Sequence, residues 1–136
     1  MEITVQTIVN APIKKVWEFW SKPEHITQWT HASDDWHAPY SDNDLRKGGK
    51  FKTTMAAKDG SFSFDFEGAY TEVVDHSLIE YAIADGRKVK IVFTGEGDFT
   101  KVVEFFEPES VNSIEMQEGG WQSILDNFKR YAEANG

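Results

Sequence analysis

Apolar and polar residues alternate in short runs over most of this chain. Residues 2–9 alternate imperfectly and indicate a first strand. From residue 36 to residue 108 one such run follows another, and "SFSFDFEGAY" places a phenylalanine at every second position. Asp-Gly pairs at residues 59–60 and 85–86 separate these runs, and this dipeptide is a strong hairpin signal. Strands joined by such short turns are antiparallel neighbours, so we expect a meander of about six strands.

Two segments near the N-terminus carry their apolar residues at helical spacing instead. "NAPIKKVWEFW" predicts a short helix for which Asn10 or Ala11 is the expected cap. "SKPE" follows, with Ser21 and Glu24 in the spacing of a capping box. A second short helix is therefore expected to begin there and to end near Trp29.

The C-terminal segment "QEGGWQSILDNFKRYAEANG" predicts a long amphipathic helix that begins near Asn112. Gly119 and Gly120 stand directly before Trp121, and each costs a helix interior about 1 kcal/mol relative to alanine. We expect these glycines to let the helix backbone lie against a strand or the short helices, or to let the helix bend before Trp121. Direct contact between a ligand and these glycines is the less favoured alternative.

The order of elements predicts an α+β fold in a single domain, residues 1–136. The only large surface available to the long helix is the apolar face of the meander. A bent antiparallel sheet wrapped around one helix encloses space, which aromatic side chains would fill or line. Since 14% of the residues are aromatic, either an aromatic core or a ring-lined cavity is expected.

Charge and composition exclude several classes of function. Lys and Arg total 14 against 23 Asp and Glu, and a net charge of −9 disfavours nucleic acid and anionic membrane surfaces. The chain has no cysteine, which excludes disulfides, thiolate zinc sites and cysteine nucleophiles. "MEITVQTIV" has no basic region followed by an apolar core, so we expect a cytoplasmic protein without membrane insertion.

Five segments, taken together, resemble a known family. "APIKKVWEFW", "DLRKGGKF", "DGSFSFDFEGAY", "DGRKVKIVF" and "GGWQSILDNFKRY" occur in the order seen in bacterial single-domain proteins similar to the activator of the heat-shock protein 90 ATPase. That family lies within the START-like, birch-pollen-allergen-like (SRPBCC) superfamily. The resemblance implies the helix-grip fold, in which a curved antiparallel sheet of about seven strands grips the C-terminal helix. It does not imply one activity, because members include lipid carriers, ligand sensors, cyclases and chaperone regulators.

Ten apolar side chains are the candidate ligand-binding residues, by alternation and by the layout of that fold. The sheet is expected to contribute Phe51, Met55, Phe64, Phe66, Tyr81 and Phe93, the long helix Trp121, Leu125 and Phe128, and the second short helix Trp29, which would close the mouth. The alternative is that all ten pack a dry core. A slip of one residue in register would turn every strand face over.

The segment "HASDDWH" holds the one cluster that could bind a metal or supply an acid–base pair: His31, Asp34, Asp35 and His37. Its spacing matches no zinc signature, so a solvated loop is favoured and no metal is expected. No cofactor is expected either, because "EGGW" and "RKGGK" lack the glycine spacing of a nucleotide fingerprint. His25 is interpreted as a surface residue.

Three functions stay open. The first is binding of a small, largely apolar ligand, a lipid or an aromatic metabolite, in the cavity. The second is a regulatory interaction with a chaperone. The third is a cyclase- or hydrolase-type enzyme that uses Glu67, Tyr70 or Tyr81 for proton transfer, although Glu67 lies opposite the Phe64 face unless Gly68 marks a bulge.

Overall fold

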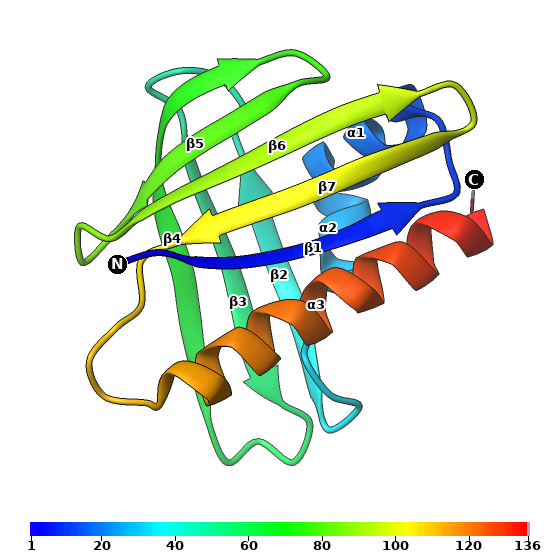
Figure 1. Cartoon of the computed structure of the whole chain (residues 1–136). Coiled ribbons are helices and arrows are strands. Elements are labelled where there is room, and N and C mark those ends of the chain that lie inside the picture. Colours follow the sequence, from blue (N-terminus) through cyan, green and yellow to red (C-terminus); the bar gives the residue numbers. More distant parts are fainter. Residues whose placement is uncertain (136) are drawn as a thin grey trace.

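The computed structural model describes residues 1–135 and shows a seven-stranded antiparallel sheet that curves around one long helix (Figure 1). The strands are β1 (Ile3–Val9), β2 (Trp36–Asn43), β3 (Lys50–Ala57), β4 (Ser63–Val74), β5 (Leu78–Ile83), β6 (Lys88–Glu96) and β7 (Phe99–Phe106). The helices are α1 (Ile13–Ser21), α2 (Pro23–Trp29) and α3 (Ile114–Asn135). The expected α+β helix-grip fold, with two short helices after the first strand, is confirmed.

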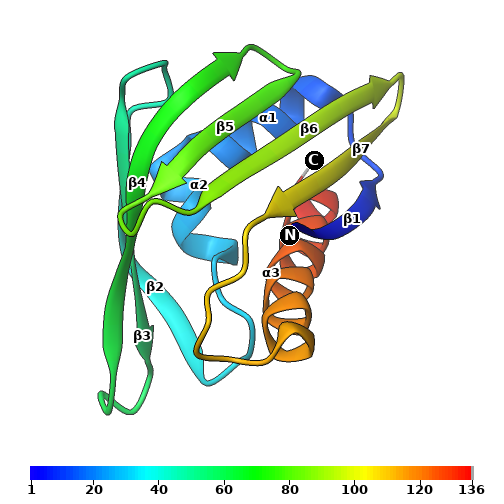
Figure 2. The ribbon, with the colours of Figure 1, turned by 60° about the vertical axis from the view of Figure 1, so that its left-hand side comes forward.

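The path of the chain explains why a concave interior exists. The strand order is β1-β7-β6-β5-β4-β3-β2, so β1 and β2 follow each other in the chain but form opposite edges of the sheet. α1 and α2 make that crossing on the concave side (Figure 2). The chain then returns strand by strand until β7 pairs with β1, with Ile3 opposite Phe106 and Val9 opposite Thr100. α3 runs along β1 and covers the remaining concave surface.

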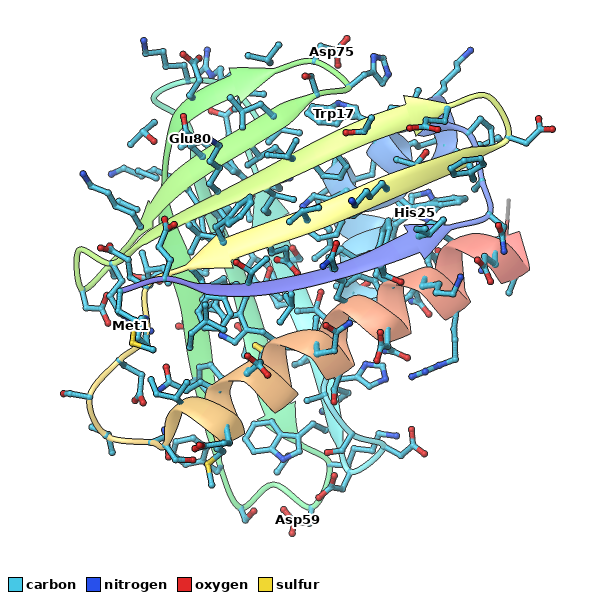
Figure 3. The ribbon with its side chains drawn as sticks, viewed as in Figure 1. Met1, Trp17, His25, Asp59, Asp75 and Glu80 are labelled. Atoms are coloured by element: carbon cyan, nitrogen blue, oxygen red, sulfur yellow. The ribbon has the colours of Figure 1, made fainter. Side chains whose placement is uncertain are left out.

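Both Asp-Gly turns form as the sequence predicts. Gly60 and Gly86 have φ angles of 79° and 95°, a region that suits glycine and strains other residues. Asp59 accepts a hydrogen bond at Oδ1 from the backbone N–H two residues on, at 2.8 Å, and Asp85 does the same at 3.1 Å. Asp59 lies at the outer tip of the β3–β4 hairpin (Figure 3). These are Asx turns, in which the side chain supports the chain reversal.

The expected caps of the two short helices are wrong. Pro12 is the N-cap of α1 and makes no side-chain cap, so neither Asn10 nor Ala11 fills that role. Ser21 is the last residue of α1, and its hydroxyl donates to a carbonyl one turn back in that helix at 2.5 Å. The residue that precedes α2 is instead Lys22, again without a side-chain cap. With only one residue between the helices, no serine is free to form a capping box.

α3 begins two residues later than expected. Ser113 caps it, since its hydroxyl accepts the N–H of Met116 at 3.1 Å. The helix continues unbroken through Gly119 and Gly120, and a Cβ built on either glycine meets no atom within 4 Å. The expectation that these glycines permit a close backbone approach is therefore wrong.

The core lies between the sheet and the helices. Its largest fully buried apolar side chains are Val9, Val16, Ile79, Ile91, Val102, Phe106, Leu125 and Phe128. Trp17 extends from α1 toward the sheet (Figure 3), where its ring centroid is 5.2 Å from that of Phe93. His25 is not a free surface residue, because its Nδ1 lies 2.6 Å from the Tyr131 hydroxyl and so connects α2 to α3. None of the helices in residues 1–135 is long and apolar enough to span a membrane.

Candidate ligand-binding cavity

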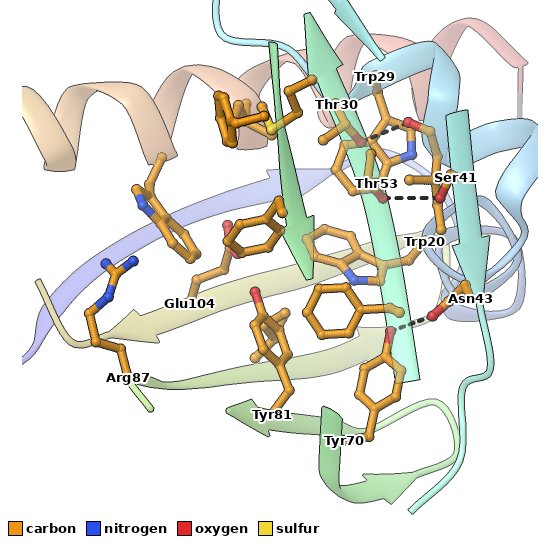
Figure 4. Close-up of a pocket in the computed structure, with 18 of the residues that line it drawn as sticks. Trp20, Trp29, Thr30, Ser41, Asn43, Thr53, Tyr70, Tyr81, Arg87 and Glu104 are labelled. Carbon is orange, nitrogen blue, oxygen red and sulfur yellow. Dashed lines mark hydrogen bonds between the residues drawn. The ribbon is translucent and has the colours of Figure 1, made fainter. Parts of the chain in front are cut away.

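A cavity of about 420 Å³ lies between the concave face of the sheet and α3 (Figure 4). Aromatic and aliphatic side chains form much of its wall, and polar groups are confined to a few places. The wall consists of Trp20, Ile26, Trp29, Thr30, Ser41, Asp42, Asn43, Phe51, Thr53, Met55, Phe64, Phe66, Tyr70, Tyr81, Arg87, Ile91, Glu104, Glu109, Asn112, Gln117, Trp121 and Ile124.

Most of the predicted site residues lie on this wall. They are Trp29, Phe51, Met55, Phe64, Phe66, Tyr81 and Trp121. The alternation read from the sequence therefore gives the correct face of β3, β4 and β5. That these side chains bind a ligand remains a prediction.

The other predicted site residues, Phe93, Leu125 and Phe128, are buried in the core and do not line the cavity. Trp20 fills the space in front of them, with its ring centroid 5.4 Å from Phe93 and 4.8 Å from Phe128. Trp29 adds to this plug at 4.9 Å from Phe128. The two tryptophans thus close one end of the cavity, so Trp29 forms part of an inner wall.

The opposite end of the cavity reaches solvent. Phe64 on β4 is 43% exposed, and Asn112 in the loop before α3 is exposed as well. The cavity therefore opens between β4 and that loop. Phe62, directly before β4 and two residues from Phe64, is 59% exposed, and its ring lies 6.1 Å from that of Trp36. Aromatic rings thus extend the apolar wall beyond the opening.

Near β2 the polar groups of the cavity satisfy one another. The Tyr70 hydroxyl donates to Asn43 Oδ1 at 2.5 Å, and Asn43 Nδ2 donates to the Ser21 carbonyl at 2.7 Å. The Ser41 and Thr53 hydroxyls lie 3.0 Å apart (Figure 4). Burial raises the pKa of Tyr70 above its usual value, so the hydroxyl stays protonated. Since these groups are already paired, they bind the elements of the fold together without requiring a ligand.

The Glu104 carboxyl and the Tyr81 hydroxyl, unlike those groups, have no hydrogen-bond partner in residues 1–135. Figure 4 shows both side chains, with Arg87, at one end of the cavity. Glu104 is 6% exposed. Burial raises the pKa of Glu104 to about 8, so its protonated form predominates at pH 7. Burial, and then the neighbouring Glu104 charge, also raise the pKa of Tyr81.

Sequence reasoning missed Glu104, although a signal was present. Thr100, Val102, Glu104 and Phe106 occupy alternate positions of β7, and all four are buried. Period-two alternation therefore places this glutamate on the inward face. Its neighbours across the sheet, Val5 on β1 and Ile91 on β6, are apolar.

Glu67 does not reach the cavity, which corrects the acid–base alternative. It is exposed and pairs in register with Lys52 on the outward face. Gly68 does not reverse the strand, because the β3–β4 ladder passes through it without a shift. A Cβ at Gly68 would lie 2.3 Å from the Ala82 carbonyl oxygen, so this glycine permits a close approach to β5. The irregularity in β4 falls later, between Tyr70 and Glu72.

The histidine cluster is a loop that packs on α3. Asn127 Nδ2 donates to His31 Nε2 at 2.9 Å, which places the proton of the neutral ring on a buried Nδ1 that has no partner within residues 1–135. Burial lowers the pKa of His31, so its neutral form is favoured. Asp35 accepts from the Ser33 hydroxyl at 2.5 Å. Across the described residues, no three His, Asp or Glu side chains are placed to hold a metal ion.

A curved sheet, a gripped helix and a cavity open at one end define a helix-grip protein with an internal pocket. The family model described as "Activator of Hsp90 ATPase homolog 1-like protein" matches residues 10–133. The chain therefore belongs to this family, as the five quoted segments indicated. Proteins with this fold commonly bind hydrophobic ligands.

Solved structures agree with this membership. An AHSA1-like protein from Aeromonas hydrophila is 43% identical with a TM-score of 0.93, over 100% of this chain and 94% of that one. A protein from Cytophaga hutchinsonii is 57% identical with a TM-score of 0.84, over 98% of this chain and 93% of that one. A Nitrosomonas europaea protein, 17% identical over 99% of this chain and 96% of that one with a TM-score of 0.84, shares the fold. No curated protein matches the chain.

Proposed function

We propose that this protein binds a small, largely apolar molecule, a lipid or an aromatic metabolite, in the cavity between the sheet and α3. The observation that carries the proposal is a cavity of about 420 Å³ with aromatic walls and one open end. This volume lies within the range of roughly 300–1,000 Å³ that is typical of small-molecule sites.

The walls suit a compact ligand. Phe51, Phe66 and Trp121 offer flat apolar surfaces, and Trp29 closes the inner end. A two-ring molecule that buries about 250 Å² of apolar surface gains about 6 kcal/mol before the costs of association. The costs of association offset part of this gain, so simple aromatic probes should bind only weakly.

The mechanism is uptake and release, with no bond made or broken. The ligand enters past Phe64 and the loop that carries Asn112, where the cavity opens. Binding is favourable because it removes the ligand's apolar surface from water. The ligand is released when its free concentration falls or when it transfers to the apolar surface of a partner. Sequestration or delivery of a poorly soluble molecule follows from this arrangement.

A neutral aromatic probe tests the proposal. Calorimetric titration with 1-naphthalenemethanol should show saturable binding at one site per chain. Ile124, which lines the cavity from α3, allows a blocking variant, and Ile124→Phe should weaken binding at least about tenfold by filling the space. Ile8→Phe is the matched control, because Ile8 is 50% exposed on β1 and lies outside the cavity. Equal affinity in both variants, or no saturable binding to the wild type, contradicts the proposal.

The family supplies a second candidate, a regulatory interaction with a heat-shock protein 90 chaperone. The match to the ATPase-activator family over residues 10–133 favours it. In that case the acidic outer surface would make the contacts, and the cavity would be incidental. A change in the chaperone's ATPase rate on adding this protein supports this role, and an unchanged rate at saturating concentration argues against it.

A further inference from the structure

Glu104 is the one acidic side chain deep inside the cavity, and it lacks a partner. The residue is 6% exposed, and in the part of the chain that the structure describes nothing forms a hydrogen bond with its carboxyl. Within residues 1–135 only His31 Nδ1 is a fully enclosed side-chain polar atom without a partner, so the unpaired Glu104 oxygens face the cavity space. The Ser41–Thr53 and Asn43–Tyr70 pairs show that other polar groups of the cavity have partners within the fold. A ligand group placed beside Glu104 would supply the missing partner.

The charges around Glu104 favour a cationic partner. Of the other charged wall residues, Asp42 is exposed and lies in register with Lys52 on the outward face, which leaves Glu109 and Arg87. Arg87 is already paired, because its Nε lies 2.8 Å from Asp85 Oδ2. Once its carboxyl ionises, Glu104 would therefore repel an anion placed beside it and attract a cation.

Aromatic rings gather at the same end. Phe66 lies 6.2 Å from Tyr81 and 6.1 Å from Trp121, measured between ring centroids. The faces of such rings attract ammonium groups, and a ring cluster beside a carboxylate is a favourable setting for an organic cation. Tyr81 stands next to Glu104, whose charge helps to raise the Tyr81 pKa.

Binding of such a ligand would change the protonation state of Glu104. Tyr81 from β5 faces Glu104, Arg87 from the β5–β6 turn lines the same end of the cavity, and Val5 and Ile91 beside Glu104 are apolar. Burial holds the Glu104 pKa at about 8. An ammonium group at contact distance favours the ionised carboxylate and lowers that pKa, so the carboxyl gives up its proton when the cation binds.

We propose that the cavity takes an organic cation, with an amine or ammonium head paired to Glu104 and an apolar body against the aromatic walls. The inference rests on the proposed function, which requires only that the cavity bind an apolar molecule. It adds the feature by which the cavity would select among apolar molecules, which is one positive charge on the end of the ligand that lies against β7.

Two probes with the same rings separate these claims: 1-naphthylmethylamine, which is cationic at neutral pH, and 1-naphthalenemethanol, which is neutral. The wild type should bind the amine about tenfold more tightly than the alcohol at pH 7. Glu104→Gln should remove this preference, so that this variant binds the amine and the alcohol with affinities within about threefold of each other. Glu80→Gln is the matched control, because Glu80 lies on the outward face of β5 (Figure 3), and it should retain the preference.

A second measurement requires no variant. Calorimetry in two buffers with different ionisation enthalpies should show that the amine releases close to one proton per site at pH 7, and that the alcohol releases none. Binding of the alcohol without preference for the amine, or a preference that survives Glu104→Gln, overturns the inference and leaves the proposed function standing. Failure of both probes to bind overturns the two together.

Discussion

Trp121 of α3 lies flat on Phe106 of β7, with ring centroids 4.1 Å apart and ring planes 8° from parallel. This contact fastens the first half of the helix to a strand that is also paired with β1. Phe106 is fully buried, and Glu104 lies two residues away on the same strand face. The stacked pair therefore sets how closely α3 approaches the part of the cavity that holds the unpaired carboxyl.

Removing the indole should destabilise the protein measurably. We expect Trp121→Ala to lower the free energy of unfolding by about 2 kcal/mol, since the indole is half-buried and its removal leaves Phe106 without a stacking partner. Trp36→Ala is the control, because Trp36 contacts the exposed rings of Phe62 and Phe64 and should cost less than about 1 kcal/mol. Urea unfolding followed by circular dichroism measures both, and equal losses would contradict this account.

Alanine should be better than glycine in the middle of α3. A Cβ at Gly119 or Gly120 meets no atom within 4 Å, so each substitution should stabilise the protein by about 0.5–1 kcal/mol. Gly68→Ala is the contrasting variant, because its Cβ would lie 2.3 Å from a carbonyl oxygen and should cost about 2 kcal/mol. Thermal unfolding reads out all three. A loss of stability in Gly119→Ala or Gly120→Ala would show that the glycines serve a contact or a bend.

The carboxyl of Glu104 should make stability fall as pH rises. Its folded pKa is about 8 against an ordinary value of 4.5, so the folded form retains a proton that the unfolded form releases. Stability is therefore complete below pH 4.5 and is lost as pH rises toward 8, by up to on the order of 3 kcal/mol between pH 5 and pH 8.

Glu104→Gln has no ionisable carboxyl at this position. Between pH 5 and pH 8 the wild type should therefore lose more unfolding free energy than the variant does. Urea titrations at pH 5, 6, 7 and 8 give the difference directly. Glu80→Gln on the outer face is the control for the loss of a carboxylate. If the Glu104→Gln and wild-type curves run parallel, the carboxyl is not buried as described.

The Tyr70 hydroxyl should stabilise the fold through Asn43. Tyr70→Phe leaves Asn43 Oδ1 without its donor inside the protein, and we expect a cost of about 1–3 kcal/mol. Tyr40→Phe is the matched control, since Tyr40 is 50% exposed and its hydroxyl can be replaced by water contacts at under about 0.5 kcal/mol. Denaturant unfolding of both variants distinguishes them, and an equal small effect would contradict the role of this pair.

The strands and their turns could be predicted because their signals are local. Alternation fixed the inward faces of β3 to β5, and Asp-Gly fixed the turns at Gly60 and Gly86. Pairing of β1 with β7 has no such signal, because Val9 and Thr100 meet from far apart in the chain. The resemblance to the family implied a sheet of about seven strands but did not say with which strand the first one pairs.

The cavity could be predicted only in outline. Alternation shows which face of a strand points inward, but it cannot show whether the space in front of that face is filled. Phe93 and Phe128 lie behind Trp20 because α1 and α2 cross the interior there. Glu104 follows the same alternation as its buried neighbours, but charged side chains are rarely buried, so this signal is easily overlooked.

The central claim is that the cavity holds a small molecule, and native mass spectrometry of gently purified protein tests it most directly. We expect a fraction of the molecules to carry one bound compound, which solvent extraction would release and identify as largely apolar. Its loss in Ile124→Phe, and its retention in Ile8→Phe, would place it in the cavity. A wild-type protein that stays at the bare mass and also fails to take up 1-naphthalenemethanol would contradict the account.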